Sequence, residues 1–354
     1  MSDPYPVSVP EPPTDLVRGP TRLDTLDLSE TDGHDAEAFV KRDDRTGGPA
    51  QGNKLRKLEY LLGDAADAGA DVLVTGGGVQ SNHCRATAVV AAERGLDCHL
   101  VLLGEEPEEP DGNLLLSRVA GADVEYCPWT EFSGDLDNEL GEAADRLREA
   151  GCDPFVVPLG GSTARGSLGY VRAYAECRRQ AAGHADADVA AGDAPVDSIH
   201  VATGSGGTLA GLVAGALLAG DDTDVVGVDV TPYGATYLEQ VVTDLVHGVG
   251  EELDHAFDDA AVERAVTVRS GYVGPGYGEP AEADAEAIVA AGRDVGLVLD
   301  PTYTGKAFRA FREHLADADA GRHLFVHTGG SYGLFPKREA VGAALERAER
   351  EDGR

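Results

Sequence analysis

Lysine is scarce in this chain of 354 residues: it occurs five times, whereas arginine occurs 24 times. Acidic residues outnumber basic ones by 63 to 29, which gives a formal net charge of −34. The carboxylates are spread along the chain rather than gathered in one block, which indicates an acidic surface on a folded core. Because salt screens repulsion between such charges, the composition predicts a halophilic protein of a salt-rich cytoplasm. The same charge argues against nucleic acid as a partner.

Cysteine and long apolar runs are also scarce. The five cysteines are widely spaced and form no CxxC pair, and the ten histidines show no metal-ligand spacing. We therefore expect neither a metal site nor a disulfide framework. No apolar run approaches the roughly 18 residues of a membrane-spanning helix, and the N-terminal residues do not have the pattern of a signal peptide. These absences favour a cytoplasmic protein without a membrane segment.

Short apolar runs alternate with helical patterns along most of the chain. The strand-like runs lie at residues 72–75, 98–103, 124–127, 155–158, 198–202, 225–230 and 324–327, and residues 39–44 are expected to end a further strand. A helix is expected after the glycine-rich stretch 159–167. This alternation predicts parallel βαβ units and a doubly wound α/β fold, and the length favours two domains or one large domain with an insertion. Residues 1–20, rich in proline and acid, are expected to form an extended arm. The Ala/Asp/Gly-rich segment 181–195 is expected to be a surface loop.

Two of the five lysines, Lys54 and Lys57, lie where the glycine-bearing loop 46–52 meets a helical pattern. A buried lysine amine can be held neutral and act as a nucleophile or form a Schiff base. The alternative is an ordinary first helical turn with Asn53 as its N-cap, and these residues alone favour neither interpretation. Arg56 and Lys57 could balance a phosphate charge or lie on a solvated helix face.

Two glycine-rich loops each join a predicted strand to a predicted helix. In the first, residues 75–83, free backbone N–H groups with Ser81 and Asn82 could cradle a carboxylate, or a side chain could simply cap the helix. The second lacks both the GxGxxG and the Walker A pattern, so we expect it to bind a single phosphate group. Its residues are Thr203, Gly204, Ser205, Gly206, Gly207 and Thr208.

Tyr277 and Tyr303 lie in glycine- and proline-rich stretches late in the chain. They could anchor loops, stack on a planar ligand or move a proton. Lys306 is expected to be a helix-start residue rather than a second catalytic amine. An amine, a phosphate loop, a carboxylate loop and two tyrosines together suit pyridoxal phosphate chemistry on a small amino acid. A nicotinamide dehydrogenase would need a GxGxxG fingerprint, and a non-catalytic phosphate binder would have no use for Lys54.

With its motifs taken in order, the sequence closely resembles the family of D-cysteine desulfhydrase and 1-aminocyclopropane-1-carboxylate deaminase. These are fold type II, tryptophan synthase β-like pyridoxal phosphate enzymes. The motifs that carry the resemblance are residues 40–44, 52–59, 80–83, 204–208, 300–306 and 327–330.

The resemblance implies two doubly wound open-sheet α/β domains with the cofactor in the cleft between them. Residues 1–60 and 170–354 would form the larger, cofactor-binding domain. Residues 61–169 would form the smaller domain and carry the Gln80-Ser81-Asn82-His83 loop. The family also suggests a homodimer.

The resemblance further implies a role for each matching residue. Lys54 would hold the cofactor as a Schiff base and later remove the Cα proton of the substrate, with Ser81, Tyr277 and Tyr303 as the other catalytic residues. Asn82 would face the oxygen on the pyridine ring, Thr203 to Thr208 would hold the phosphate, and Tyr303 would stack on the ring. Ser81, Asn82 and His83 would receive the substrate carboxylate. Thr304 or Thr328 would contact the pyridine nitrogen.

Three positions favour the desulfhydrase branch: His83, Thr304 and Thr328 replace the glutamine, glutamate and leucine of the cyclopropane deaminases. A carboxylate beside the pyridine nitrogen would strengthen the electron sink for opening an unactivated ring, whereas a hydroxyl suffices when a thiol leaves. The expected reaction is the α,β-elimination of D-cysteine, or a related β-substituted amino acid, to pyruvate, ammonia and sulfide. The cyclopropane deaminase and cysteate sulfo-lyase activities remain alternatives, and the sequence does not distinguish D from L substrates.

Overall fold

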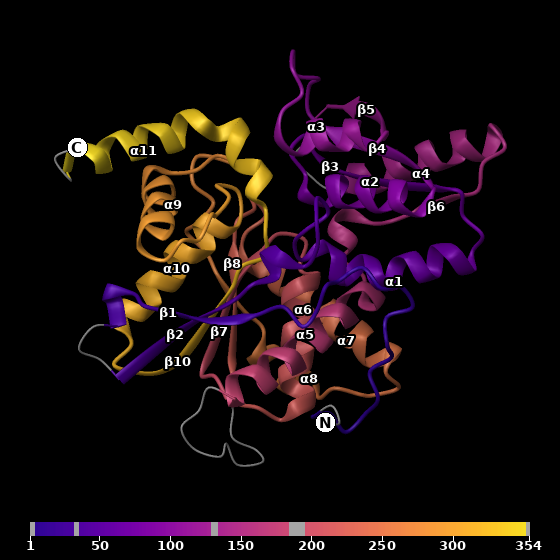
Figure 1. Ribbon diagram of the computed structural model, residues 1–354. Coiled ribbons are helices and arrows are strands. Elements are labelled where there is room, and N and C mark those ends of the chain that lie inside the picture. The colour runs from indigo at the N-terminus through magenta and orange to yellow at the C-terminus, as the bar shows by residue number, and fades with distance from the viewer. Residues whose placement is uncertain (1–3, 32–34, 129–133, 184–194, 352–354) are drawn as a thin grey trace.

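The computed structural model describes residues 4–31, 35–128, 134–183 and 195–351. Within these ranges the chain forms a larger and a smaller lobe, each built on one β-sheet, and helix α1 (Lys54–Asp67) runs between them (Figure 1). Leu58 of this helix packs into a core of the smaller lobe, whereas Tyr60 packs into a core of the larger one. The helix that begins with Lys54 therefore belongs to both lobes.

The larger lobe contains a six-stranded sheet with the order β1-β2-β10-β7-β8-β9. All neighbouring strands are parallel except β1 and β2. The strands are β1 (Leu23–Leu26), β2 (Asp35–Lys41), β7 (Ser198–Thr203), β8 (Asp224–Asp229), β9 (Thr267–Arg269) and β10 (Ala320–Val326). One face packs against α5 (Ala164–Ala182), α6 (Gly207–Ala219), α7 (Ala235–Glu252) and α8 (Asp259–Ala265). The other packs against α9 (Glu282–Asp294) and α10 (Thr304–Asp317), and α11 (Arg338–Glu351) lies against α9.

The smaller lobe contains a parallel four-stranded sheet with the order β5-β4-β3-β6. Its strands are β3 (Val72–Gly78), β4 (Asp97–Leu103), β5 (Asp123–Cys127) and β6 (Pro154–Val156). Helices α1, α2 (Asn82–Arg94) and α3 (Gly112–Val119) cover one face, and α4 (Gly134–Glu149) covers the other. Because helices cover both faces of both sheets, the predicted doubly wound α/β architecture is confirmed.

Several details differ from the expectations. The short elements β1, α8 and β9 were not predicted, and α5 begins at Ala164, before the glycine-rich stretch ends. The predicted domain boundaries after residues 60 and 169 fall inside α1 and α5, so the division into domains stays a prediction. Residues 184–194, most of the predicted surface loop, lie outside the described part of the chain.

Residues 4–20 contain no helix or strand and lie along α1 and α5. Tyr5 Oη donates a hydrogen bond to the carbonyl oxygen of Val171 at 2.6 Å, and Tyr60 Oη donates one to that of Pro10 at 2.7 Å. The contact is so close at Gly63 that a Cβ atom there would lie 2.1 Å from Pro13 Cγ. The predicted arm is thus fastened to the two helices that join the lobes.

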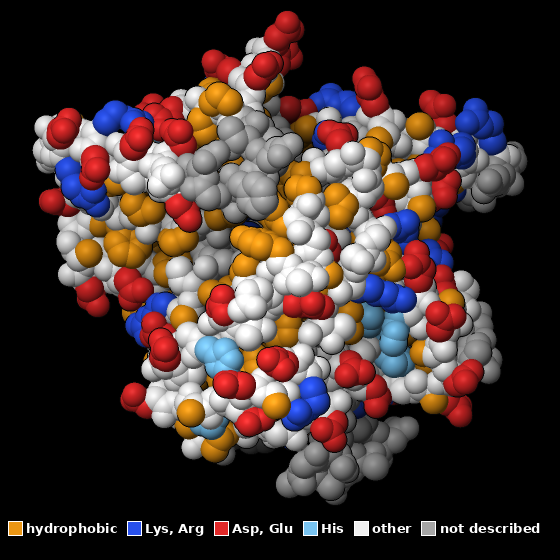
Figure 2. Space-filling view, turned by 180° about the vertical axis from the view of Figure 1, so that it is seen from behind, with side chains coloured by type: hydrophobic (Ala, Val, Ile, Leu, Met, Phe, Trp, Pro, Cys, Tyr) orange, Lys and Arg blue, Asp and Glu red, His pale blue; other side chains and the backbone are white. Residues whose placement is uncertain are grey.

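On the face shown in Figure 2, acidic side chains are scattered and form no single block. This agrees with the even spacing of carboxylates along the sequence. In the part of the chain that the structure describes, no helix combines the length and the apolar character needed to cross a bilayer.

Candidate active site

A cavity lies between the lobes and is lined by the start of α1, the β3–α2 junction and the loops that follow β7, β8 and β10. Doubly wound folds bind ligands at this carboxyl edge of their strands. The predicted site residues that line the cavity are Lys54, Ser81, Asn82, His83, Thr203, Gly204, Ser205, Gly206, Thr208, Tyr277, Tyr303 and Thr328. Two of the predicted residues, Gly207 and Thr304, are not among the lining residues.

Lys54 is the first residue of α1, and the loop before it is tightly held. Thr46 Oγ1 accepts a hydrogen bond from the Gly52 N–H at 2.8 Å and donates one to the Gly52 carbonyl at 3.0 Å. Gly52 has a φ of +115°, and a Cβ atom there would lie 2.8 Å from the carbonyl oxygen of Thr328. Burial lowers the pKa of the Lys54 amine to about 8, so a neutral, nucleophilic amine is accessible near physiological pH.

Asn53 does not cap α1, because its backbone is helical and its side chain makes no capping bond. Instead its Nδ2 donates a hydrogen bond to Thr208 Oγ1 at 3.0 Å. Asn53 also lines the cavity. The capping interpretation was wrong, and Asn53 joins the lysine loop to the predicted phosphate loop.

The loop at residues 204–208 is supported by Ser162, which the sequence reading missed. Ser162 Oγ accepts hydrogen bonds from Lys57 Nζ at 3.0 Å and from the Gly207 N–H at 3.2 Å. Both its lone pairs are then engaged, so its 2.7 Å contact with Ser205 Oγ is donated by Ser162. The Ser205 hydroxyl hydrogen is thereby left for a further acceptor, which is what an anion in the cavity would provide.

Gly160 also contributes to this corner of the cavity. It has a φ of +66°, and a Cβ atom there would lie 2.3 Å from Ser205 Oγ and 3.5 Å from Lys54 Nζ. Only glycine fits between these two side chains. Lys57 donates a second hydrogen bond to the Gly160 carbonyl at 3.2 Å. Lys57 is buried and lines the cavity, so it does not lie on a solvated face.

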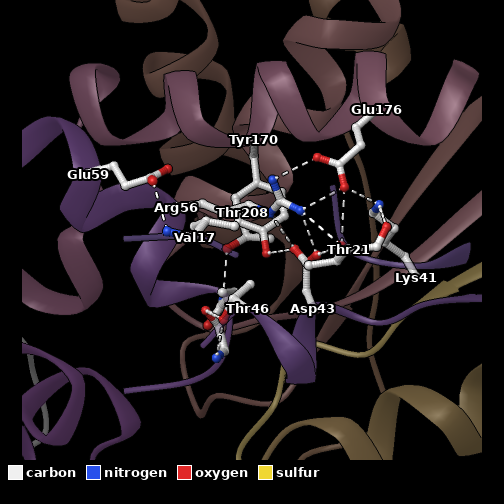
Figure 3. Close-up of polar contacts among 12 residues, drawn as sticks. Val17, Thr21, Lys41, Asp43, Thr46, Arg56, Glu59, Tyr170, Glu176 and Thr208 are labelled. Atoms are coloured by element: carbon white, nitrogen blue, oxygen red, sulfur yellow. Dashed lines mark hydrogen bonds and ion pairs between the residues drawn. The ribbon is translucent and has the colours of Figure 1, made fainter. Parts of the chain in front are cut away.

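Arg56 points away from the cavity into a buried ionic network (Figure 3). Its Nε and Nη2 donate to the two oxygens of Asp43, both at 2.8 Å, and its Nη1 donates to Glu176 at 3.2 Å. Tyr170 also donates to Asp43, at 2.6 Å, and Lys41 pairs with Glu176. Arg56 is therefore neither a phosphate ligand nor solvated, and it fastens α1 to α5 and to the 3₁₀ turn η2 (Asp43–Arg45) that follows β2.

The β3–α2 junction brings Ser81, Asn82 and His83 to the cavity. Ser81 is the N-cap of α2, and its Oγ accepts from the Cys84 N–H at 3.2 Å. Thr75 Oγ1 donates its one hydrogen to the Val157 carbonyl at 2.7 Å, so the 2.9 Å contact between Thr75 Oγ1 and His83 Nε2 is donated by His83. Ser81 caps α2 and also lines the cavity, so both interpretations of this residue are compatible with the structure.

The proton position matters for His83. Burial, with the charges of Lys54 and Lys57, lowers the pKa of His83 well below its usual range, so the ring is neutral. Its Nδ1 then carries a lone pair, and no partner for it occurs among the described residues. A lone pair repels a carboxylate, so the predicted role of His83 in receiving the substrate carboxylate does not fall to Nδ1, and the role itself stays a prediction. The backbone N–H of His83, in the first turn of α2, is the group suited to that task.

Tyr277 and Tyr303 form a pair, with their hydroxyl groups hydrogen-bonded and their rings at 80° to one another. A Cβ atom at Gly204 would lie 3.4 Å from Tyr303 Cε1, so this ring lies against the phosphate loop. Burial raises the pKa of Tyr277 to about 12 and that of Tyr303 well above its usual range. Both phenols are protonated at neutral pH and can act as proton donors there.

Thr304 does not reach the cavity. Its Oγ1 donates to Asp300 Oδ1 at 2.7 Å and accepts from the Asp300 N–H at 2.7 Å, at the start of α10. Asp300, which the sequence reading missed as a site residue, is buried and does line the cavity. Of the two predicted contacts to the pyridine nitrogen, Thr328 is therefore the one that the geometry leaves. Lys306 lies in α10 and donates to the Val273 carbonyl, which agrees with its expected structural role.

The donor set of this cavity fits pyridoxal phosphate. A lysine amine with a lowered pKa suits its aldehyde, and the glycine-rich loop at the start of α6 offers backbone N–H and hydroxyl donors to its phosphate. The ring of Tyr303 beside Gly204 provides an aromatic surface next to that loop.

Comparisons with known proteins agree with this fit. D-cysteine desulfhydrase from Klebsiella pneumoniae (strain 342) is 38% identical over 333 residues, which span 92% of this chain and 95% of that protein. A crystal structure described as that of an ACC deaminase homologue has a TM-score of 0.82 at 35% identity, covering 94% of this chain and 96% of that one. O-ureido-L-serine synthase, at 17% identity, shares the fold with a TM-score of 0.64 over 90% of this chain and 92% of its own. A family model described as "Pyridoxal-phosphate dependent enzyme" matches residues 14–329, and the chain belongs to this family.

Proposed function

We propose that this chain is a pyridoxal phosphate-dependent lyase that eliminates the β-substituent of D-cysteine, or of a related amino acid, to give pyruvate, ammonia and sulfide. The observation that carries the proposal is the meeting of three groups in one cavity. These are the Lys54 amine, the anion loop at residues 204–208 and the start of α2 from the opposite lobe. The relative that is 38% identical, named D-cysteine desulfhydrase, supports the same reaction.

Bound pyridoxal phosphate supplies the electron sink that accepts the charge developing at the substrate Cα. Lys54 holds the cofactor and then takes the Cα proton, a task suited to an amine with a pKa near 8. Ser205 and Thr208 bind the phosphate through their free hydroxyl hydrogens, and Lys57 supports that loop from behind. Ser81 and the first N–H groups of α2 bind the substrate carboxylate. The Tyr277–Tyr303 pair donates a proton to the departing group.

The charges around the cavity favour a thiol over a sulfonate as the leaving group. Among the described lining residues the basic side chains are Lys54 and Lys57, burial lowers the pKa of both, and no arginine is present. One lysine is needed for the cofactor and the other supports the phosphate loop, so a sulfonate would find no free basic side chain to pair with. Asp137, exposed at the cavity, would repel it. These features support a desulfhydrase over a cysteate sulfo-lyase.

We also propose a homodimer in a salt-rich cytoplasm. The net charge of −34 supports the salt-rich setting. The exposed side chains of Leu115 and Val119 on α3, together with Phe335 in the adjacent 3₁₀ segment η4 (Ser331–Lys337), offer an apolar surface that a second copy could cover. Mass measurement in concentrated KCl tests the assembly, and a monomeric mass would contradict it.

The test of the activity compares the wild-type chain with Lys54→Ala. The wild-type protein should be yellow, should retain the cofactor covalently after borohydride reduction, and should release pyruvate and sulfide from D-cysteine in high salt. Lys54→Ala should lose the covalent label and at least about 10³-fold in activity, as expected when a covalent catalyst is removed. L-cysteine, cysteate and the cyclopropane amino acid serve as competing substrates. A wild-type protein that takes up no cofactor would contradict the proposal.

A further inference from the structure

Asn113 on α3 lies just behind the cavity, and its side chain contacts three residues at the start of α2 and in the loop before it. The residue is 1% exposed and does not line the cavity. Its Oδ1 accepts a hydrogen bond from Arg85 Nε at 3.1 Å, and its Nδ2 donates to the Gln80 carbonyl at 3.1 Å and to Asn82 Oδ1 at 3.0 Å. We call Arg85, Asn113 and Asn82 the amide relay.

The orientation of the Asn113 side-chain amide is fixed, because one of its partners can only donate a hydrogen bond and another can only accept one. Arg85 Nε–H can only donate, so the atom facing it is the Asn113 oxygen. The Gln80 backbone carbonyl can only accept, so the atom facing it is the Asn113 nitrogen. The same nitrogen faces Asn82, which must therefore turn its oxygen toward Asn113. Because Asn82 also lines the cavity, its NH₂ group is the end left for a ligand there.

Arg85 gives this chain of bonds a charged end. Its side chain is 1% exposed, and it forms no ion pair with a carboxylate in the described residues. Burial lowers its pKa to about 10, so it stays protonated at neutral pH. The charge is held by the Pro49 carbonyl at 2.6 Å, the Gln51 carbonyl at 3.1 Å and the face of the Tyr332 ring. Pro49 and Gln51 belong to the loop that leads into Lys54.

We propose that Arg85 and Asn113 are positioning residues that fix the polarity of the Asn82 amide. They hold its N–H groups toward the cavity, where they donate to a negatively charged oxygen of the bound cofactor. A buried cation at the far end of a hydrogen-bond chain polarises each bond, which makes the Asn82 N–H a stronger donor. The same arginine ties the start of α2 to the lysine loop. The inference rests on the proposed function for the identity of the ligand.

The test uses Asn113→Asp, which keeps the shape of the side chain. An aspartate at this position still accepts from Arg85 but cannot donate to Asn82, and its charge repels Asn82 Oδ1. Asn82 then turns its nitrogen toward position 113 and its oxygen toward the cavity. The dissociation constant for pyridoxal phosphate, measured by titrating the apoprotein, should rise about tenfold or more, as expected for the loss of a hydrogen bond to a charged group.

A second background separates positioning from general damage. In Asn82→Ala the relay has no amide to orient, so adding Asn113→Asp there should change the dissociation constant less than twofold. Ser117→Ala is the matched control, because Ser117 donates to the backbone carbonyl of Asn113 at 3.0 Å and leaves the amide untouched. The control should bind the cofactor as the wild-type protein does.

Two outcomes are distinguishable. An equal loss from Asn113→Asp in both backgrounds, or an equal loss in Ser117→Ala, would overturn the relay while leaving the proposed function standing. A wild-type protein that binds no pyridoxal phosphate would overturn the proposed function, and with it the identity of the ligand that the relay serves. The visible absorbance band of the bound cofactor gives an independent readout, since it should shift in Asn113→Asp and stay unchanged in Ser117→Ala.

Discussion

Proton positions decide what single residues of this cavity can do. The hydroxyl hydrogen of Ser162 is committed to Ser205, so Ser205 can donate to an anion. The Nε2 hydrogen of His83 is committed to Thr75, so its other nitrogen can only accept. Ser205 can therefore attract a negative group, whereas His83 Nδ1 repels one. The phosphate is accordingly expected at the Ser205 end of the cavity.

The pKa of Lys54 leads to a prediction about pH. Below about pH 8 the amine of the apoprotein is protonated and cannot attack an aldehyde, and above it the neutral amine can. The rate of reductive trapping of pyridoxal phosphate at Lys54 should therefore rise with pH and level off above a midpoint near 8. Mass spectrometry of the trapped protein at a series of pH values measures this rate. A midpoint near the ordinary lysine value of about 10.4 would contradict the assignment.

The sequence showed the site residues that sit in glycine-rich loops after strands, since those loops have a local pattern. It did not show Ser162 or Asn113, whose partners Ser205 and Arg85 lie 43 and 28 residues away along the chain. The choice between a solvated and a site role for Arg56 and Lys57 likewise depends on partners far along the chain, Glu176 and Gly160. No local pattern of residues carries that information.

At the scale of elements, α1 is the helix on which the site depends. It presents Lys54 as its first residue, and Arg56 and Lys57, two and three residues further, are both buried but on different sides of the helix. Arg56 belongs to the ionic network with Asp43 and Glu176 (Figure 3), whereas Lys57 faces the cavity. The network therefore sets the rotation of the helix, and with it the direction of the Lys54 side chain.

Removing one charge of this network tests its contribution. Asp43→Asn should lower the free energy of unfolding by about 3 kcal/mol, because it leaves the buried Arg56 guanidinium with Glu176 alone. Burial opposes ionisation of Asp43, but Arg56 and Lys41 lower its pKa below the usual range. This carboxylate therefore adds stability above the unfolded pKa of about 4, and that stability is lost as the pH falls toward the folded pKa.

Urea unfolding at pH 7 and at lower pH measures both effects. The control is Asp145→Asn, the same substitution in the exposed pair with Arg148, which should change the unfolding free energy by less than about 0.5 kcal/mol. Equal effects of the two substitutions would show that the buried network does not hold α1.

The regular elements were predicted where the apolar pattern was long, as in α1, whose leucines are buried, and in most strands of the two sheets. The missed elements are short: β9 has three residues, β1 four and α8 seven. Strand β1 pairs with β2 at the sheet edge, and its four residues are too few to show an alternation of buried and exposed positions. Such elements are stabilised by their neighbours rather than by their own sequence.

For the whole molecule, the acidic surface leads to a prediction about salt. A net charge of −34 repels itself across the fold, and 1 M salt shortens the screening length from about 10 Å at 0.1 M to about 3 Å. Raising KCl from 0.1 M to 2 M should therefore stabilise the protein by several kcal/mol and raise its melting temperature by about 5–10 °C. Scanning calorimetry across a KCl series measures this. A melting temperature independent of KCl would contradict the halophilic interpretation.

The scarcity of lysine gives the molecule an unusual relation to the aldehyde it is proposed to bind. The amines of Lys41, Lys57 and Lys306 are buried and hydrogen-bonded. The Lys337 side chain is 29% exposed and forms an ion pair with Glu279. Lys54 and Lys57 both line the cavity, and burial lowers the pKa of both amines, but the Lys57 amine is engaged by Ser162 and by the Gly160 carbonyl. A reactive aldehyde therefore meets almost no competing amine on the surface. Labelling of lysine side chains by the aldehyde should therefore concentrate at Lys54.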